Sequence, residues 1–492
     1  MADKPIFTKP IPFVNVQESG YEELSGATPL AMNIIVDGKG CVKRRPGIKA
    51  YSGAPSTVID ANGLVGIHAT RNMKLLVVGA AGAERPIYSL TAGGATAIGG
   101  GIPPNGLRGA SRPVFAETEM LLVIAGGDEM QKIELATLAS SRLAATAPKA
   151  SHVIANHLRL LANDVAIDQA AVRFSDIAGG ETSFAGHLVW AYSGFGTSGY
   201  FTAEGKPDDV MALMENTNEV FVPGTGTIQV FQPDAQVTYA PVGTTEIGMV
   251  APYSVIKLDM NFAWMDQLKR FILSDGRSYK DISAPIARTL DTIDVADDCF
   301  GYRVAIGELD ALVWSFPQDG RTFVYQTGVG WGQWSGWTDN WAPFKVQCCK
   351  TMPAWFPDGT NHAKAAVVVG TSDGFVGEFD FDTPTDLGTE IKAYVRTGFQ
   401  DRGTQKMKHC RSVAVTMRRS ASGPPVRLGD IRFADSVGNW SDPIPLESGD
   451  REPVVILRSL GSYRTRQWEF SFTSTETLAL VSVLEEFEVS DQ

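Results

Sequence analysis

Residues Gly194 to Gly199 match the spacing G-x-G-x-x-G, which binds a pyrophosphate when it joins a strand to the start of a helix. Here the segment continues as YFTAEG, which carries no helix-capping pattern, so we expect no dinucleotide site. The sequence contains no H-E-x-x-H pair, Walker loop or EF-hand loop. No cofactor is therefore expected.

Histidines and cysteines give no metal-binding pattern. Only His152 and His157 lie close in sequence, and a spacing of five suits neither a helical ligand pair nor one face of a strand. The cysteines are an odd set without C-x-x-C spacing, which predicts reduced thiols instead of disulfides or zinc. The adjacent Cys348 and Cys349 would project to opposite faces of a strand. The remaining members of the two sets are His68, His187, His362, His409, Cys41, Cys299 and Cys410.

Paired carboxylates would be needed for glycan cleavage. The segment Ser315–Phe323 is loosely similar to the Asp box of sialidase-like propellers, but Asp319 and Gly320 are adjacent and no second copy occurs. In such boxes the aspartate holds a turn, so even a good match would be structural. Other carboxylates cluster nearby, and we interpret them as solvated loop residues: Asp294, Asp297, Asp298, Glu308 and Asp310. We predict that the chain is not an enzyme and assign no catalytic, cofactor-binding or metal-binding residue.

Aromatic and basic clusters allow a binding and a structural interpretation. The stretch Trp331–Trp341 holds four of the ten tryptophans. These rings could stack on sugars or bases, but we favour packing between sheets. The tight basic runs are Lys43–Arg45 and Arg418–Arg419, which we expect to be solvated strand ends.

The elements that would position these residues are short strands in repeated hairpins. Apolar strands followed by Gly, Asn or Asp turns recur, and Gly and Pro together number 77 of 492 residues. Repeats of this size predict an all-β fold, a β-propeller of six or seven blades, with a non-propeller all-β arrangement as the alternative. Helices are expected only at Asp128–Ala145 and Asp208–Glu215. The repeats begin near positions 75, 121, 158, 219, 262, 312 and 367.

The pattern of apolar and polar residues changes after Asp386, where apolar and polar residues alternate in the predicted strands. We therefore predict three regions: residues 1–50, an N-terminal arm and ring-closing strand; residues 51–386, the propeller; and residues 387–492, a small C-terminal β-sandwich or barrel domain. From Glu390 onward the chain has 14 basic and 14 acidic residues, which leaves 29 and 41 in residues 1–389. The net charge of −12 thus belongs to residues 1–389. It argues against nucleic-acid binding by this part of the chain.

Targeting and membrane signals are not expected. Apolar runs such as Lys74–Gly82 are far shorter than the ~20 residues of a membrane span. The N-terminal sequence lacks the basic region and apolar run of a signal peptide.

Four stretches resemble the packaged-DNA-stabilisation proteins, also called tail hub or nozzle proteins, of short-tailed bacteriophages. In PLAMNIIVDGKGCVKRRPGI (Pro29–Ile48), the matching residues are Asn33, Gly40, Arg44, Arg45, Pro46, Gly47 and Ile48. The other stretches are Tyr200–Gln232, Ala311–Trp334 and Leu457–Val489. Glu219–Phe221 departs from the family's aliphatic pattern, and the Trp331–Trp341 run is longer than expected.

This resemblance implies a structural virion protein located in the tail and assembled in the host bacterial cytoplasm. A homo-hexamer ring would lie below the portal and adaptor and continue the DNA channel. Its partners would be the head-to-tail adaptor, tail fibres or tailspikes and a plug or needle. Double-stranded DNA would pass without sequence-specific binding, and no small-molecule substrate is implied. The alternatives are a carbohydrate-binding or glycan-cleaving β-propeller and a monomeric scaffold propeller.

Overall fold

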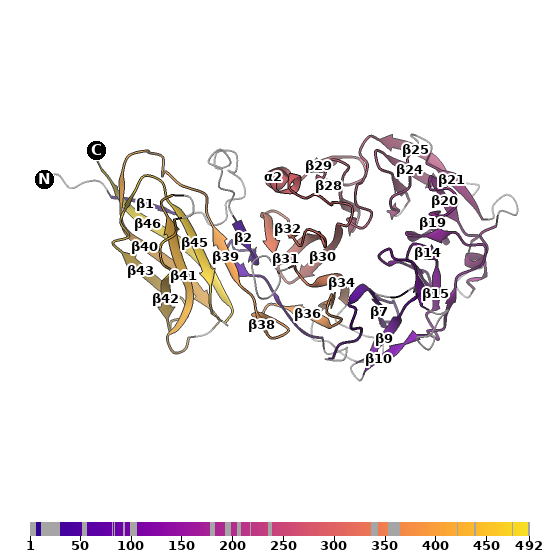
Figure 1. The fold of residues 1–492 in the computed structure, drawn as a ribbon, viewed down its shortest axis with the longest axis horizontal. Helices are drawn as coiled ribbons and strands as arrows, with labels where there is room; N and C mark the ends of the chain where they lie inside the picture. Colours follow the sequence, from indigo (N-terminus) through magenta and orange to yellow (C-terminus); the bar gives the residue numbers. More distant parts are fainter. Residues whose placement is uncertain are drawn as a thin grey trace.

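The structure is a computed structural model of the 492-residue chain (Figure 1). It describes residues 6–10, 30–51, 57–80, 82, 84–91, 94–98, 106–177, 183–191, 198–203, 208–216, 218–234, 239–335, 343–352, 365–420, 422–436, 439–474 and 476–490. None of the helices in these ranges has the length and apolar character needed to cross a membrane.

Seven blades of antiparallel strands surround one centre and form a seven-bladed β-propeller, and blades six and seven continue into larger sheets (Figure 1). In each of the first six blades, four strands follow one another outward from the centre. Blades one to three contain β6 (Leu64–Ala69), β7 (Leu75–Gly79), β9 (Ile87–Thr91) and β10 (Gly94–Ala97); β12 (Val114–Glu117), β13 (Leu121–Ala125), β15 (Gln131–Glu134) and β16 (Ser140–Arg142); and β18 (Val153–Asn156), β19 (Arg159–Asn163), β20 (Ala171–Phe174) and β21 (Gly199–Thr202).

The next three blades repeat this order. They contain β22 (Met214–Glu215), β23 (Val220–Pro223), β24 (Ile228–Pro233) and β25 (Tyr239–Thr245); β26 (Ile256–Leu258), β27 (Asn261–Met265), β28 (Phe271–Ser274) and β29 (Tyr279–Asp281); and β30 (Phe300–Ile306), β31 (Leu309–Ser315), β32 (Thr322–Gln326) and β33 (Gly330–Trp334). Two short ribbons pair β8 (Glu84–Arg85) with β11 (Leu107–Arg108) and β14 (Asp128–Glu129) with β17 (Lys149–Ala150).

Blade seven closes the ring with a strand from the start of the chain. Its first three strands are β34 (Val346–Met352), β35 (Ala366–Thr371) and β36 (Val376–Asp380). The fourth is β5 (Gly47–Ala50), which pairs antiparallel with β36 and places Ile48 opposite Phe379. The sheet then continues through β37 (Thr385–Asp386) and β38 (Thr389–Glu390).

The predicted propeller is confirmed, and its blade number is seven. All seven repeat starts expected from the sequence fall in, or directly before, the second strand of a blade: β7, β13, β19, β23, β27, β31 and β35. These strands have a partner on each side and neighbouring blades against both faces, so their residues are almost continuously buried. A strand buried on both faces reads as an apolar run, which is the signal that recurred in the sequence.

Both expected helices are wrong. Residues 128–145 form β14, β15 and β16, because β15 pairs with β13 on one side and β16 on the other. This ladder satisfies the backbone groups of β13 and overrides the helical spacing of the side chains. Residues 208–215 contain β22 and no helix. The described helices are instead one-turn segments: η3 (Ala185–Leu188), η4 (Ala284–Ile286) and α2 (Ala287–Asp291).

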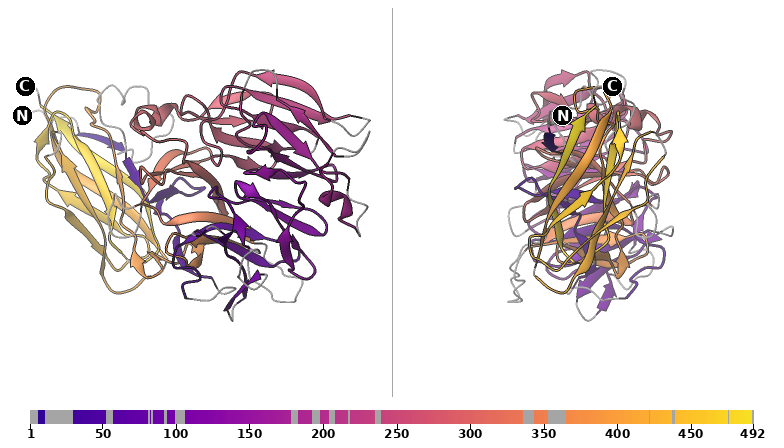
Figure 2. Two further views of the ribbon diagram at one scale, coloured as in Figure 1. Left: turned by 45° about the vertical axis from the view of Figure 1, so that its right-hand side comes forward. Right: turned by 90° about the vertical axis from the view of Figure 1, so that its left-hand side faces the viewer.

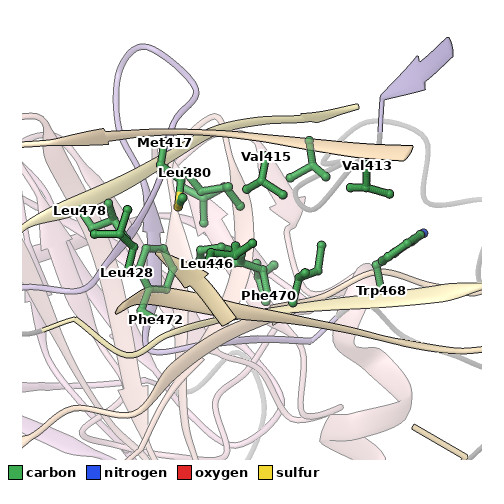
Figure 3. Close-up of a cluster of buried hydrophobic side chains, with 14 of the residues drawn as sticks. Val413, Val415, Met417, Leu428, Leu446, Trp468, Phe470, Phe472, Leu478 and Leu480 are labelled. Atoms are coloured by element: carbon green, nitrogen blue, oxygen red, sulfur yellow. The ribbon is translucent and has the colours of Figure 1, made fainter. Parts of the chain in front are cut away.

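The C-terminal domain is a sandwich of two sheets (Figures 1 and 2). One sheet contains β40 (Lys408–Arg419), β43 (Val454–Arg458), β44 (Ser462–Tyr463) and β46 (Leu478–Val489). The other contains β39 (Ala393–Arg396), β41 (Val426–Ala434), β42 (Ile444–Ser448) and β45 (Gln467–Phe472). Val413 and Val415 of β40 face Trp468 and Phe470 of β45 across the core (Figure 3).

The N-terminal arm enters both parts of the molecule. Its strands β1 (Ile6–Pro10), β3 (Ile34–Val36) and β4 (Val42–Arg44) belong to the sandwich sheet of β46. Strand β2 (Leu30–Met32) pairs parallel with β33 of blade six and antiparallel with β39 of the sandwich. A single nine-stranded sheet therefore runs from the propeller into the sandwich.

Candidate functional site

The N-terminal motif lies at the joint between the propeller and the sandwich. Asn33 separates β2 from β3 and has a φ of 55°, in the left-handed region where asparagine is tolerated better than most residues. Its Oδ1 accepts bonds from the N–H of Ser335 (2.9 Å) and from Nε of Arg45 (3.0 Å). Its Nδ2 donates to Oγ of Ser335 (2.9 Å) and to the carbonyl of Lys392 (2.8 Å). One side chain thus joins the end of blade six to the sandwich.

Arg45 forms the centre of this joint. Its guanidinium binds Asp386 through Nη1–Oδ1 (3.0 Å) and Nη2–Oδ2 (2.5 Å), and both side chains have an exposed fraction of 0%. The remaining donors reach Asn33, the carbonyl of Pro46 (3.1 Å) and the carbonyl of Ser335 (3.4 Å). All five N–H groups of the guanidinium are therefore used. Such a fully bonded ion pair holds its geometry but offers no free group for catalysis.

Neighbouring motif residues also have structural roles. A Cβ atom on Gly47 would lie 2.3 Å from the carbonyl oxygens of Thr383 and Thr385, so only glycine lets β5 dock there. Arg44 donates to the carbonyls of Ser474 (2.7 Å) and Glu476 (3.3 Å) in the sandwich.

The expectation that the basic runs are solvated is wrong for Arg44, Arg45 and Arg419, which are buried. Arg419 binds both carboxylate oxygens of Glu476, each at 2.9 Å. Lys43 remains partly exposed and pairs with Asp37 at 2.7 Å. The partners of the buried arginines lie far along the chain, which hides them from sequence inspection.

A second stretch of the resemblance, Tyr200–Gln232, contains a turn held by Asp208. Its carboxylate accepts backbone N–H bonds from Thr225 (3.0 Å), Gly226 (2.8 Å) and Thr227 (2.9 Å). Burial opposes ionisation of Asp208, but these hydrogen bonds outweigh it and hold its pKa below the ordinary value. Asp208 therefore fixes the turn between β23 and β24.

The closing stretch, Leu457–Val489, is fixed around Arg466. This guanidinium binds Asp435 through Nε–Oδ1 (2.6 Å) and Nη2–Oδ2 (3.0 Å). Its Cζ lies 4.0 Å from the ring centre of Phe433 and 4.2 Å from that of Tyr463. The residue closes one end of the sandwich core.

The histidines make separate contacts. His68 binds Glu117 (2.8 Å), His187 binds the carbonyl of Leu158 (3.1 Å), and His409 binds Ser462 (3.1 Å). His157 occupies the turn between β18 and β19, and His362 lies outside the described residues. Within the described ranges, no group of three His, Cys, Asp or Glu side chains could hold a metal.

The cysteines are free thiols, and those of β34 project to opposite faces as predicted. Cys348 packs in the cluster between blades seven and one, and Cys349 packs in the cluster between blades six and seven. Burial raises the pKa of Cys348 to about 12 and that of Cys349 further, so neither is a reactive thiolate.

The predicted carboxylate cluster does not converge on one site. Asp310 binds Arg303 at 2.7 Å, and Glu308 accepts the N–H of Gly38 at 3.2 Å. Asp298 accepts the N–H of Gln318 at 2.7 Å, and burial raises its pKa. In the Asp-box-like segment, Asp319 binds the guanidinium of Arg321. Asp294 and Asp297 form no ion pair within the described residues.

The tryptophans at the start of the Trp-rich stretch pack between blades, as favoured. Trp331 lies 5.3 Å from the ring of Phe271, and its Nε1 donates to the carbonyl of Ile282 at 2.6 Å. Trp334 contacts Phe344 and Phe379, with ring centres 5.6 and 5.8 Å away. Trp337 and Trp341 lie outside the described residues.

Two glycine-containing motifs could indicate a ligand site or a nucleophile. Gly194–Thr197 lies outside the described residues, while Gly199 begins strand β21 and no helix. Gly370–Gly374 has the spacing G-x-S-x-G, which is found at the nucleophile of α/β-hydrolases. Here it joins β35 to β36, two antiparallel strands, and therefore forms a hairpin turn instead of a strand-to-helix elbow.

The centre of the propeller contains a cavity of about 390 Å³, which we call the axial cavity. Residues of, or next to, the first strand of every blade line it. Its polar wall includes Arg112, His152 and Tyr253. The rings of His152 and Tyr253 stack with centres 5.0 Å apart. Sequence reasoning missed this site because each blade contributes only one to four residues.

Comparisons with known proteins give no family. No family model matches the chain, and no curated protein matches it. Among solved structures, the extracellular domain of a hybrid two-component system from Bacteroides thetaiotaomicron is 11% identical with a TM-score of 0.44. The match covers 82% of this chain and 48% of that one, so the chain spans about half of that structure's length.

Two further solved structures are similar at lower scores. Hsv2 of Kluyveromyces lactis is 9% identical with a TM-score of 0.33, over 62% of this chain and 97% of that chain. An exo-β-1,3-galactanase from Phanerochaete chrysosporium is 8% identical with a TM-score of 0.28, over 90% of this chain and all of that one.

Proposed function

We propose that the chain is a structural protein of a bacteriophage tail, the hub or nozzle that continues the DNA channel below the portal and adaptor. The observation that carries the proposal is the joint formed by Asn33, Arg45 and Asp386. Asn33 and Arg45 are the residues by which the N-terminal segment resembles tail hub proteins. Their burial in the joint gives a structural reason for these residues in the motif.

In a tail channel, the domains of each subunit must keep a fixed orientation, without rotation of one domain relative to the other. A nine-stranded sheet through β33, β2 and β39, together with the buried ion pair, resists such rotation between propeller and sandwich. Six copies in a closed ring would each repeat one head-to-tail interface. The rigid two-part subunit supports this form of assembly.

The charge distribution supports passage of DNA. Residues 1–389 carry the whole net charge of −12, and a negatively charged wall repels phosphates at distances up to the Debye length. In this proposal the ring helps to retain packaged DNA and lets it pass at ejection. The adaptor, tail fibres or tailspikes and a plug or needle would be its neighbours in the virion tail.

Negative-stain electron microscopy of the purified full chain, alone and with a cognate adaptor, tests this proposal. We expect six-fold rings with a central hole, at least in the presence of adaptor. Monomers that form no ring beside the adaptor would overturn the proposal. Monomers that also bind a glycan array would favour the carbohydrate-binding alternative.

A further inference from the structure

The axial cavity has a basic wall in an acidic protein. Its charged lining residues are Arg112 and Lys350, and the described lining includes no aspartate or glutamate. Glu117 approaches this wall only through His68, and its other oxygen accepts the N–H of Arg71 at 2.7 Å. The cavity therefore has a charge opposite to that of the whole chain, which is −12.

Arg112 is held in place but is not neutralised. Its Nη1 donates to the carbonyl of Gln347 (2.8 Å), and its Nη2 donates to the side-chain oxygen of the same residue (2.7 Å). Its Cζ lies 3.4 Å from the ring centre of Phe300. Both acceptors are uncharged, and burial lowers the pKa of Arg112 to about 10. The charge of Asp298 acts on Arg112, but the two side chains form no ion pair within the described residues. A guanidinium that is held in place by uncharged acceptors can bind an anion.

A second guanidinium lies behind the same part of the wall. Arg85 has an exposed fraction of only 2%, and its Nε has no partner among the described residues. Its Nη2 makes one long bond, 3.5 Å, to the carbonyl of Gly126, which also accepts the N–H of Ser111. Ser111 also lies close enough to the hydroxyl of Tyr253, a lining residue, to lower the pKa of that hydroxyl. Arg85 is thus linked to the cavity by the effect of its charge on Tyr253.

Both guanidinium groups act on the Tyr253 hydroxyl. Burial raises the pKa of Tyr253, while the charges of Arg85 and Arg112 oppose that rise. Both guanidinium groups therefore interact electrostatically with this hydroxyl. Arg85 is buried and Arg112 is half-buried, and neither forms an ion pair within the described residues, so a bound anion would stabilise both charges.

We propose that the axial cavity binds a small tetrahedral oxyanion of the phosphate type. Arg112 binds it directly, Tyr253 donates a hydroxyl bond, and the charge of Arg85 stabilises it from behind. The volume of about 390 Å³ also admits the organic part of a small phosphomonoester. This inference does not rest on the proposed tail function.

Isothermal titration of the full chain with inorganic phosphate, in chloride buffer at constant ionic strength, tests the site. We expect saturable binding to one site, weakened at least tenfold by Arg112→Gln and reduced by Arg85→Gln. Arg277→Gln is the matched control, because this exposed arginine pairs with Glu219 outside the cavity. Its affinity for phosphate should equal that of the wild type. Glycerol 3-phosphate in a parallel titration distinguishes a phosphomonoester site, which binds it more tightly, from a site for the free ion.

Circular dichroism should show that each variant folds. If Arg112→Gln does not fold, Arg112→Lys retains the charge without the planar fork and should bind several-fold more weakly. The absence of saturable binding to the wild type would overturn the proposal, as would equal affinity in wild type and the Arg112 variants.

Discussion

Arg45 and Asp386 face each other in a bidentate ion pair, with Nη1–Oδ1 and Nη2–Oδ2 distances of 3.0 and 2.5 Å. Asp386 lies on β37 and also accepts the N–H of Ile48, on the ring-closing strand β5, at 3.1 Å. The pair therefore fixes three features together: closure of blade seven, the exit of the chain from the propeller, and the attachment of the sandwich.

Replacement of Asp386 should weaken this joint strongly. Asp386→Asn leaves the guanidinium of Arg45 buried without a counter-charge, and we expect a loss of about 3–5 kcal/mol in the free energy of unfolding. The urea midpoint of the variant measures it. The double variant Arg45→Met with Asp386→Leu should recover most of the loss, because it removes both charges. Glu119→Gln, at an exposed ion pair with Arg71, is the control and should leave the midpoint nearly unchanged. A wild-type midpoint for Asp386→Asn would contradict the role of the pair.

Asn33 should be sensitive to both its amide and its backbone conformation. Asn33→Gly keeps the φ of 55° accessible but removes four side-chain bonds, so we expect a loss of about 2–3 kcal/mol. Asn33→Ala should cost about 1 kcal/mol more, because alanine also resists the left-handed conformation. Chemical denaturation of the two variants gives this difference. If alanine is tolerated as well as glycine, the backbone argument fails.

Ring closure should depend on the absence of a side chain at residue 47. Gly47→Ala places a Cβ 2.3 Å from the carbonyl oxygens of Thr383 and Thr385, so β5 must shift from its place beside β36 and β37. We expect faster amide hydrogen exchange in β36 and a lower melting temperature. Gly243→Ala on β25 is the matched control, since its Cβ would meet nothing within 4 Å. Unchanged protection of β36 in Gly47→Ala would contradict the assigned closure.

His152 should make the free energy of unfolding depend on pH. Burial lowers its pKa to about 4, compared with about 6.5 in the unfolded chain, so the unfolded state binds a proton first as the pH falls. Its contribution to stability is therefore complete above pH 6.5 and is lost progressively between pH 6.5 and 4, by about 3 kcal/mol in total. His152→Gln should flatten the stability profile in this window. A slope in His152→Gln equal to that of the wild type would refute the assignment.

The sequence could reveal the propeller because one strand per blade is buried on both faces. Strands such as β13 and β19 consist only of buried residues, and such apolar runs can be recognised without knowing their neighbours. The helix prediction for residues 128–145 failed for the opposite reason. This segment forms strands because it pairs with β13, and its own residues do not show that pairing. The joint was hidden as well: Arg45 and Asp386 are separated by 341 positions. Local spacing carries no information about such a pair.

The axial cavity was equally inaccessible from the sequence. Arg112, Tyr253 and Gln347 come from three different blades and have no common spacing. They meet only because the first strand of each blade faces the centre. Only the closed ring can therefore identify them as a group.

The position of β4 also sets the order in which the protein can complete its fold during synthesis. Val42 of β4 pairs with Leu480 of β46, near the other end of the chain. At about 5–20 residues per second, a ribosome needs roughly 20–90 s to make the residues between them. During that interval the sheet edge formed by β3 and β4 lacks β46, and slower synthesis lengthens its exposure to aggregation. Soluble yield should thus be limited by the production of the last strand.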